Sequence, residues 1–238
     1  MSYTPDKSAW LNPDIEYLFN DEIIEYDIRD AGFSIIQQFG LLSEDKMRGL
    51  IKLGKGIERH MAIGKLQRED RDFSKSLSDK FAEVRRVFIQ FNKLSDDNIV
   101  SVKKDAIYTI GTCSKTKFGK VEFMPKNTYT SYLRFPGINN LELYYSSRGI
   151  DIKGMGDHAV NRHRLYMLQF LRDIISHMEN HDPMTKRILK DFISDYKYLK
   201  LDDEYYVEFN NVSKDMNPAY NYKNILIPLT QITLREIG

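Results

Sequence analysis

Hydrophobic and polar residues alternate near the start of the chain with the period of two that is typical of a half-buried strand. In residues 22–28 (EIIEYDI), Ile24 and Ile28 lie on one face, whereas Glu25 and Asp27 lie on the other. The segment therefore predicts a strand that presents two carboxylates on its polar face.

A second group of strands is predicted in the middle of the chain. Residues 99–110 (IVSVKKDAIYTI) contain two β-rich stretches separated by the polar sequence KKD, which predicts a β-hairpin. Short strands are then expected at residues 129–135, 141–145 and 150–153, with PGINN and SSRG as the turns between them. These segments predict an antiparallel meander.

A helical period of three to four residues occurs in other parts of the first half. Ser43 suits the N-cap of a short helix that ends near Gly54. Residues 60–80 are dense in charge and are expected to be exposed. The next segment predicts an amphipathic helix, with an apolar stripe of Phe81, Val84, Val87, Phe88, Phe91 and Leu94. This helix should pack against another element.

The last third of the chain also has a helical period. One helix is expected over residues 165–178, and a second begins with Asp182 as N-cap and Pro183 as first helical residue. The order of strand, helices, hairpin, meander and helices predicts an α+β fold, in which helices cover one face of an antiparallel sheet.

Composition narrows the function classes only slightly. The 238 residues are 42% hydrophobic and 29% charged, as in an ordinary folded protein, and the net charge of +1 does not by itself favour nucleic acid or membrane. No apolar run approaches the roughly 20 residues that cross a bilayer, and the start of the chain resembles no signal peptide. We expect a cytoplasmic protein, in the host cytoplasm for a viral one, with no membrane partner. The single cysteine, Cys113, is interpreted as a packing thiol.

Asp27 and Asp105 are the candidate metal-binding residues, because one lies near the end of a strand and the other at the tip of the hairpin. Two divalent cations need carboxylates from separate rigid elements. The alternative is that Asp27 is a solvent-facing strand residue and Asp105 a turn former. Asp30, Glu25 and Asp157 are further acids that could complete a metal site.

A basic stretch from residue 103 to 134 has few acids and is interleaved with aromatic residues, as in many nucleic-acid-binding surfaces. Its members are Lys103, Lys104, Lys115, Lys117, Lys120, Lys126 and Arg134, with Phe118, Tyr129 and Tyr132. The alternative is an ordinary solvated face of a sheet.

Four segments together resemble the palm of family B DNA polymerases. DIRDAGFSII (27–36) resembles the first palm motif, D-x-x-S-L-Y-P-S-I-I, and the hairpin places Asp105 at the second Asp of the D-T-D-S turn. PKNTYTSY (125–132) resembles the K-K-R-Y segment, and GIDIKGMGDHAVNRHR (149–164) resembles the K-G segment that opens the thumb. The resemblance covers roughly residues 20–180.

The resemblance implies a palm-like domain in residues 1–125, with a reduced fingers insertion at about 43–80, and a β-meander with a helical thumb-like region in 126–238. It implies that Asp27 and Asp105 hold Mg²⁺ or Mn²⁺ as catalytic ligands, and that Lys65 and Arg68 hold a nucleoside triphosphate unless they belong to a solvated charged helix. The implied nucleic-acid contacts are Lys103, Lys104, Lys126, Tyr129, Lys153 and Arg162.

The chain departs from the family pattern in three respects. Lys103 and Lys104 replace acidic and neutral positions of the second motif, Gly32 stands where an aromatic residue polices the sugar 2′-hydroxyl, and the fingers signature K-x-x-x-N-S-x-Y-G is absent.

Two hypotheses follow. The first is a minimal, phage-type nucleotidyltransferase that acts on a DNA primer-template by a two-metal-ion mechanism. The alternative is a catalytically inactive palm homologue that binds nucleic acid or docks replication or transcription proteins in a phage complex. A metal-dependent nuclease that uses the same carboxylates is a third option.

Overall fold

The computed structural model describes residues 3–135, 141–153, 184–198 and 200. The chain divides into two compact units: unit 1 comprises Met1–Asp14 and Glu22–Thr128, and unit 2 comprises Ile15–Asp21 and Tyr129–Gly238. The boundary expected between residues 125 and 126 falls inside a long strand, because β6 (Val121–Phe135) continues from unit 1 into unit 2.

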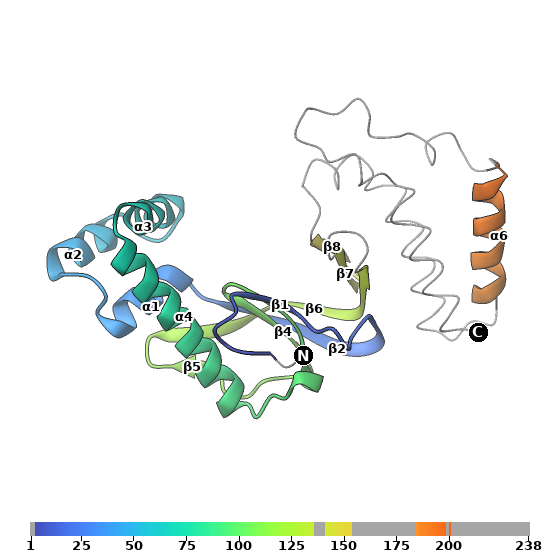
Figure 1. Ribbon diagram of the computed structural model, residues 1–238, viewed down its shortest axis with the longest axis horizontal. Coiled ribbons are helices and arrows are strands. Elements are labelled where there is room, and N and C mark those ends of the chain that lie inside the picture. The colour runs from blue at the N-terminus through green and yellow to red at the C-terminus, as the bar shows by residue number, and fades with distance from the viewer. Residues whose placement is uncertain (1–2, 136–140, 154–183, 199, 201–238) are drawn as a thin grey trace. The chain divides into compact units, whose positions relative to one another are not determined.

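Unit 1 contains an antiparallel sheet with the strand order β1–β3–β4–β2–β6 (Figure 1). Its strands are β1 (Ala9–Leu11), β2 (Tyr17–Ile28), β3 (Ile99–Lys103) and β4 (Ala106–Ile110), with the first part of β6; the short β5 (Lys117–Phe118) pairs with β6. β3 and β4 form the predicted hairpin, and β2 pairs with β4 from Ile23–Ile110 to Asp27–Ala106. The expected strand at residues 22–28 is confirmed as the second half of β2.

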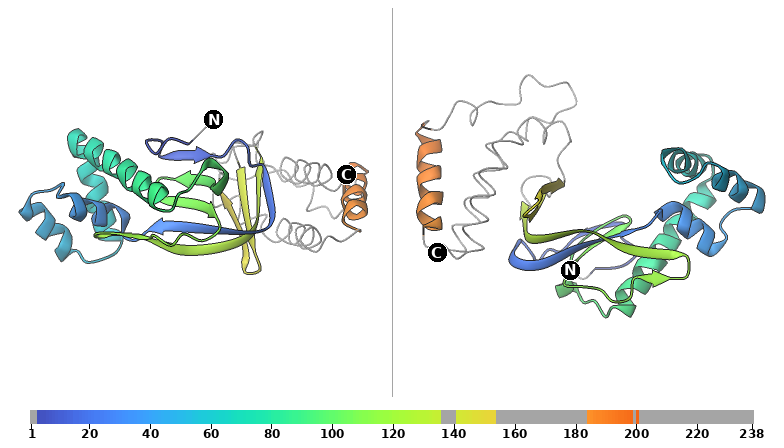
Figure 2. Two further views of the ribbon diagram at one scale, coloured as in Figure 1. Left: turned by 90° about the horizontal axis from the view of Figure 1, so that it is seen from below. Right: turned by 180° about the vertical axis from the view of Figure 1, so that it is seen from behind.

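α4 (Arg71–Phe91) covers one face of this sheet, as the sequence predicted for a helix. α1 (Ala31–Phe39), α2 (Glu44–Lys52) and α3 (Ile57–Glu69) gather with α4 at one end of the sheet (Figures 1 and 2), and a short 3-10 helix, η1 (Asp96–Asn98), follows α4. α4 runs along the sheet (Figures 1 and 2), and its Phe88 ring is fully buried. The ring centroid lies 4.2 Å from that of Phe123 and 5.5 Å from that of Tyr26. The core of unit 1 therefore lies between α4 and the apolar face of β2, so that the opposite face of β2 carries Glu25 and Asp27.

The strands of unit 2 confirm the predicted meander. The end of β6 pairs with β7 (Leu141–Ser146), and β7 pairs with β8 (Gly149–Lys153), both antiparallel. Tyr132 and Tyr144 are fully buried, and both hydroxyl groups donate hydrogen bonds to the buried carboxylate of Glu142. The same unit contains the helix α6 (Thr185–Lys197).

The α+β class is confirmed, but several local expectations need correction. Phe91, the last residue of α4, is 61% exposed, and its ring packs edge-to-face with that of Phe118. α1 was not predicted. The charge-rich segment 60–80, which was expected to be exposed, forms most of α3 and the start of α4. Three of its apolar residues, Ile63, Phe73 and Leu77, are buried.

Other predicted features lie outside the described residues: the PGINN turn, the helix at 165–178 and the Asp182–Pro183 cap. The thumb-like character of the C-terminal region stays a prediction. Cys113 is buried, as expected of a packing thiol.

Candidate functional site

Asp27 and Asp105 are brought together by the pairing of β2 with the hairpin. Asp27 pairs in register with Ala106, the residue that follows Asp105 in the chain. The backbone N–H of Ile28 also donates a hydrogen bond of 3.1 Å to the carbonyl oxygen of Asp105. The two carboxylates, which are far apart in the sequence, are thus electrostatic neighbours at one end of the sheet of unit 1.

The setting of Asp105 makes its ionised form costly. Burial raises the pKa of this carboxyl group above its usual value, and repulsion by Asp27 raises it further, although attraction to Lys104 and Lys126 works in the opposite direction. Two neighbouring carboxylates of this kind are stabilised by any additional cation.

Lys126, on β6, supplies one positive charge at this site. Its Nζ lies 3.1 Å from Oδ2 of Asp27 and 3.5 Å from Oε1 of Glu25. The Glu25 side chain is only 3% exposed, and its Oε2 accepts a hydrogen bond of 2.6 Å from Nδ2 of Asn127. Burial favours a lower pKa for Lys126, but the hydrogen bond to Asp27 and the attraction of Glu25 outweigh it and raise the pKa. Lys126 is therefore a protonated cation beside the carboxylates.

The turn that carries Asp105 is held from below by Arg85 of α4. The Arg85 side chain is buried, and its Nη1 donates a hydrogen bond of 2.8 Å to the carbonyl oxygen of Lys104. Its Nε and Nη2 donate to the carbonyl oxygen of Pro5, and Nε also donates to the Tyr3 hydroxyl. The backbone N–H of Lys104 donates to the carbonyl oxygen of Ser8. The N-terminal segment and α4 thus fix the position of the turn.

Arg85 was not among the residues predicted from the sequence to belong to the site. It lies directly after Val84 on the buried side of α4, so the signal in the sequence was a charged residue adjoining an apolar stripe. A buried arginine must find hydrogen-bond acceptors, and here it finds backbone carbonyls of two distant segments.

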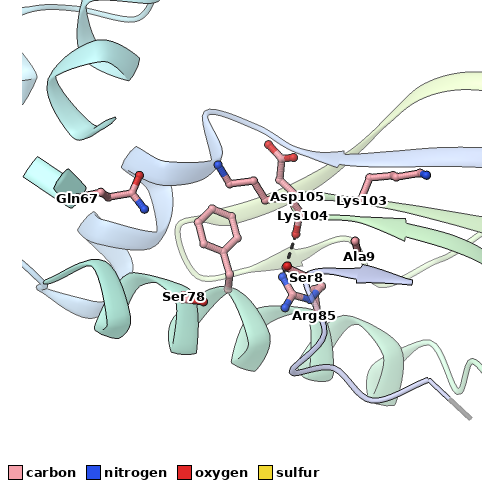
Figure 3. Close-up of a pocket in the computed structure, with 9 residues that line it drawn as sticks. Ser8, Ala9, Gln67, Ser78, Arg85, Lys103, Lys104 and Asp105 are labelled. Atoms are coloured by element: carbon pink, nitrogen blue, oxygen red, sulfur yellow. Dashed lines mark hydrogen bonds between the residues drawn. The ribbon is translucent and has the colours of Figure 1, made fainter. Parts of the chain in front are cut away.

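A pocket of about 550 Å³ lies next to Asp105 in unit 1 (Figure 3). The pocket is lined by α3, α4, the hairpin turn and the start of β1. The lining residues are Ser8, Ala9, Gln67, Ser78, Phe81, Arg85, Lys103, Lys104 and Asp105. Its size is within the range of small-molecule sites. The pocket gives a ligand access to the turn from the helix-covered side of the sheet.

The two predicted triphosphate ligands lie on the solvent side of α3. Lys65 and Arg68 are both exposed, and Nζ of Lys65 is 3.7 Å from the Glu69 carboxylate in an ion pair of the same helix. Gln67, between them in sequence, lines the pocket instead. These positions match the solvated charged helix that was the alternative interpretation.

A buried ion pair that the sequence did not single out joins α3 to the start of α1. Nη2 of Arg59 lies 3.3 Å from Oδ2 of Asp30, and the guanidinium group stacks over the Phe33 ring at 4.0 Å. Asp30 thus has a partner other than a metal ion. Gly32 also faces α3: a Cβ atom there would lie 3.5 Å from Ile63. Gly32 therefore lies where α1 contacts α3.

The predicted nucleic-acid contacts fall into different settings. Lys104 is exposed, and Lys103 and Lys153 are half-buried. Tyr129 requires correction as a base-stacking residue, because its ring is 3% exposed and its hydroxyl group donates a hydrogen bond to Asp151. Tyr132 is likewise buried. Tyr129 and Tyr132 therefore pack inside unit 2, whereas Phe118 packs against Phe88 and Phe123 in unit 1. Arg162 and the candidate acid Asp157 lie outside the described residues.

Asp27 and Asp105 supply the carboxylate oxygens that are available to a divalent cation at this site. Among the described residues, no three His, Cys, Asp or Glu side chains are grouped closely enough to hold a metal ion by themselves. Mg²⁺, however, is commonly bound by one or two carboxylates that substrate phosphates complete. The oxygen donors of Asp27 and Asp105 fit that arrangement.

The fold and the site define an α+β protein with two neighbouring carboxylates and a lysine at one end of an antiparallel sheet. The chain belongs to the family of the bacteriophage PBS1 gene 130 protein, whose family model matches residues 2–234. A comparison with curated proteins gave no match. Within the part of the chain that the structure describes, no helix is both long and apolar enough to cross a membrane.

Proposed function

We propose that this phage protein is a palm-type nucleotidyltransferase that acts on nucleic acid with the help of a divalent cation at Asp27 and Asp105. The observation that supports the proposal is the pairing of β2 with the β3–β4 hairpin, in which Asp27 pairs with Ala106 and its charge raises the pKa of the adjacent Asp105. The order of strand, helices and hairpin is the order of the two palm motifs that the sequence resembles.

Asp27 and Asp105 would hold Mg²⁺ or Mn²⁺ through their carboxylate oxygens. Such a cation stabilises charge on phosphate oxygens and makes a hydroxyl group more acidic. The role of the protein is to hold the two carboxylates in place. The register of β2 and β4 fixes Asp27, and hydrogen bonds with Arg85 and Ser8 fix the turn that carries Asp105. Catalysis by positioning and electrostatics is what phosphoryl-transfer chemistry requires.

Lysines near the carboxylates support contact with a phosphate-bearing ligand. Lys104 is exposed at the turn, and Lys126 lies on the neighbouring strand with a side chain that is 55% exposed. Ammonium groups at such positions suit phosphate oxygens. A DNA primer-template and a nucleoside triphosphate are the proposed ligands, and other phage replication or transcription proteins are the proposed partners.

The test is a primer-extension assay with Mg²⁺ or Mn²⁺ that compares the wild type with Asp27→Asn and Asp105→Asn. We expect each substitution to reduce nucleotide incorporation at least roughly 100-fold, the scale on which a single electrostatic contact to the transition state acts. Asp97→Asn is the matched control, because Asp97 is an exposed carboxylate on η1. It should retain wild-type activity.

The lysines at the turn favour one alternative, an inactive palm homologue that binds nucleic acid or docks other proteins. Lys103 and Lys104 directly precede Asp105 and supply no metal ligand. If the wild type incorporates no nucleotide but binds a primed duplex with an affinity that falls steeply with salt, the enzyme proposal is overturned in favour of this alternative. Cleavage of labelled DNA without added nucleotide would instead indicate a nuclease.

A further inference from the structure

The pocket beside the β3–β4 turn has two chemically different ends. On the side of α3 and α4, Gln67 supplies an amide, Ser78 a hydroxyl group and Phe81 an aromatic ring. The turn contributes Lys104 and Asp105 at the other end. Figure 3 shows the Lys104 side chain extending from the turn toward the side on which Gln67 lies. A volume of about 550 Å³ is that of a small-molecule site and exceeds what a simple inorganic ion fills.

The side chain of Lys104 is not used to hold the turn. The backbone N–H and carbonyl group of this residue make the contacts with Ser8 and Arg85. The side chain is exposed, and within the described residues its Nζ forms no ion pair. The left-handed backbone conformation, with a φ of 47°, suits glycine or asparagine better than lysine. A lysine here is therefore better explained by a role in binding than by a role in folding.

Arg85 is a second cation of the lining, and it has hydrogen-bonding capacity to spare. A guanidinium group has five N–H donors. Among the described residues, the contacts with Tyr3, Pro5 and Lys104 use the N–H of Nε and one N–H each of Nη1 and Nη2. The residue is 2% exposed, so the two remaining N–H groups have little access to water. A buried donor without an acceptor is costly, and an oxygen atom of a ligand in the pocket would lower that cost.

The charges around the pocket favour an anion. The lining contains one carboxylate, that of Asp105, and three basic side chains, those of Arg85, Lys103 and Lys104. Lys126 and its two carboxylate partners, Asp27 and Glu25, are not part of the lining and together add one negative charge. The balance therefore stays positive when the neighbouring groups are included.

We infer that this pocket binds a nucleotide. The phosphate groups lie against Lys104 and Arg85, since ammonium and guanidinium groups both suit phosphate oxygens. The base lies against Phe81 and Gln67, because an aromatic ring offers a stacking surface and an amide can both donate to and accept from the edge of a base. These groups take the place of the two exposed cations of α3 that the sequence resemblance implied. The inference rests on the proposed function for the role of the nucleotide as a substrate.

Isothermal titration calorimetry of the full chain with dATP, dGTP, dCTP and dTTP tests the inference. The buffer contains EDTA and no divalent cation, so that nucleotide binding is measured apart from any metal site. We expect the wild type to bind at least one of the four nucleotides. Lys104→Gln should weaken this binding by at least about tenfold, because it removes a charged donor to phosphate. Phe81→Leu keeps an apolar side chain and should weaken it by about fivefold or more through the loss of stacking.

Matched controls locate the effect. Lys52→Gln removes an exposed lysine from α2, outside the pocket lining, and should leave the affinity unchanged. Gln67→Ala tests the base end at a half-buried position if circular dichroism shows that Phe81→Leu is unfolded. The inference is overturned if none of the four nucleotides binds, if Lys104→Gln binds as tightly as the wild type, or if inorganic triphosphate binds as tightly as the nucleotides.

The result is separable from the test of the proposed function. Nucleotide binding that Lys104→Gln weakens, without any nucleotide incorporation, would support the pocket and contradict the enzyme. Incorporation with the same KM for nucleotide in the wild type and in Lys104→Gln would support the enzyme and contradict the pocket.

Discussion

At the scale of single residues, Arg85 shows how a buried charge can organise a site from a distance. Its guanidinium group meets the carbonyl oxygens of Lys104 and Pro5 and the hydroxyl group of Tyr3. Hydrogen bonds from a charged donor contribute more than neutral ones, and an unpaired buried acceptor is costly. Arg85 therefore joins α4, the N-terminal segment and the turn next to Asp105.

Replacing Arg85 with methionine should lower the free energy of unfolding by about 2–4 kcal/mol, because the carbonyl groups of Lys104 and Pro5 lose a donor. Chemical denaturation measures the change. The matched control is Arg86→Met, whose side chain is 47% exposed and forms a surface ion pair with Asp6. This control should shift stability by no more than about 0.5 kcal/mol. Equal losses in the two variants would contradict the role assigned to Arg85.

Asp105 should make stability depend on pH in a definite direction. Burial, reinforced by Asp27, raises its pKa in the folded protein above the ordinary value of 3.8, so the folded state binds this proton more tightly than the unfolded state. The cost of ionising Asp105 thus appears as pH rises above that value, and it vanishes at lower pH, where both states are protonated.

Asp105→Asn is therefore expected to unfold at a higher denaturant concentration than the wild type at pH 7, with a difference that shrinks as the pH approaches 3.8. Asp105→Glu keeps a carboxyl group at this position and should retain the pH dependence of the wild type. A wild type that is more stable than Asp105→Asn at neutral pH would contradict the assignment.

At the scale of elements, the turn between β3 and β4 combines an unfavourable backbone conformation with firm anchoring. Lys104 has a φ of 47°, in the left-handed region that glycine adopts most easily. The contacts that hold this residue, from Arg85 and to Ser8, involve only its backbone. Any residue other than proline can make these contacts at this position, so they do not depend on the lysine side chain.

Lys104→Gly should raise the free energy of unfolding by about 0.5–1 kcal/mol, because it relieves the left-handed conformation and leaves the backbone contacts intact. Thermal or chemical denaturation measures the gain. Lys103→Gly is the control: Lys103 is the last residue of β3, where glycine weakens a strand. Loss of stability in both variants would show that the Lys104 side chain contributes to the fold.

The elements differ in how well the sequence predicted them. The hairpin and residues 22–28 of β2 were predictable because β-rich and alternating sequences mark them, whereas the first five residues of β2, Tyr17–Asp21, were not predicted. α1 was not, since its sequence AGFSIIQQF has a glycine in the first turn and two adjacent isoleucines that also suit a strand. Packing decided it: Ile35 and Ile36 are both fully buried in the core of unit 1.

At the scale of the whole molecule, the division into units follows the two long strands and not a linker. β2 and β6 both pass from one unit to the other, so each unit is built from two separate segments of the chain. Nothing in the local sequence of residues 15–21 indicates that they belong with residues beyond 129, because long-range strand pairing leaves no mark on composition.

The sequence by itself determined the α+β class, the hairpin, the meander and the choice of Asp27 and Asp105 as candidates, because alternation, turn residues and polar positions within apolar strands are local patterns. Only the tertiary structure decided that these carboxylates are neighbours, that Lys126 lies beside Asp27 and Glu25, that Arg85 anchors the turn, and that Tyr129 is buried. Those outcomes depend on strand register and on the satisfaction of buried charges, which bring together groups that are far apart in the chain.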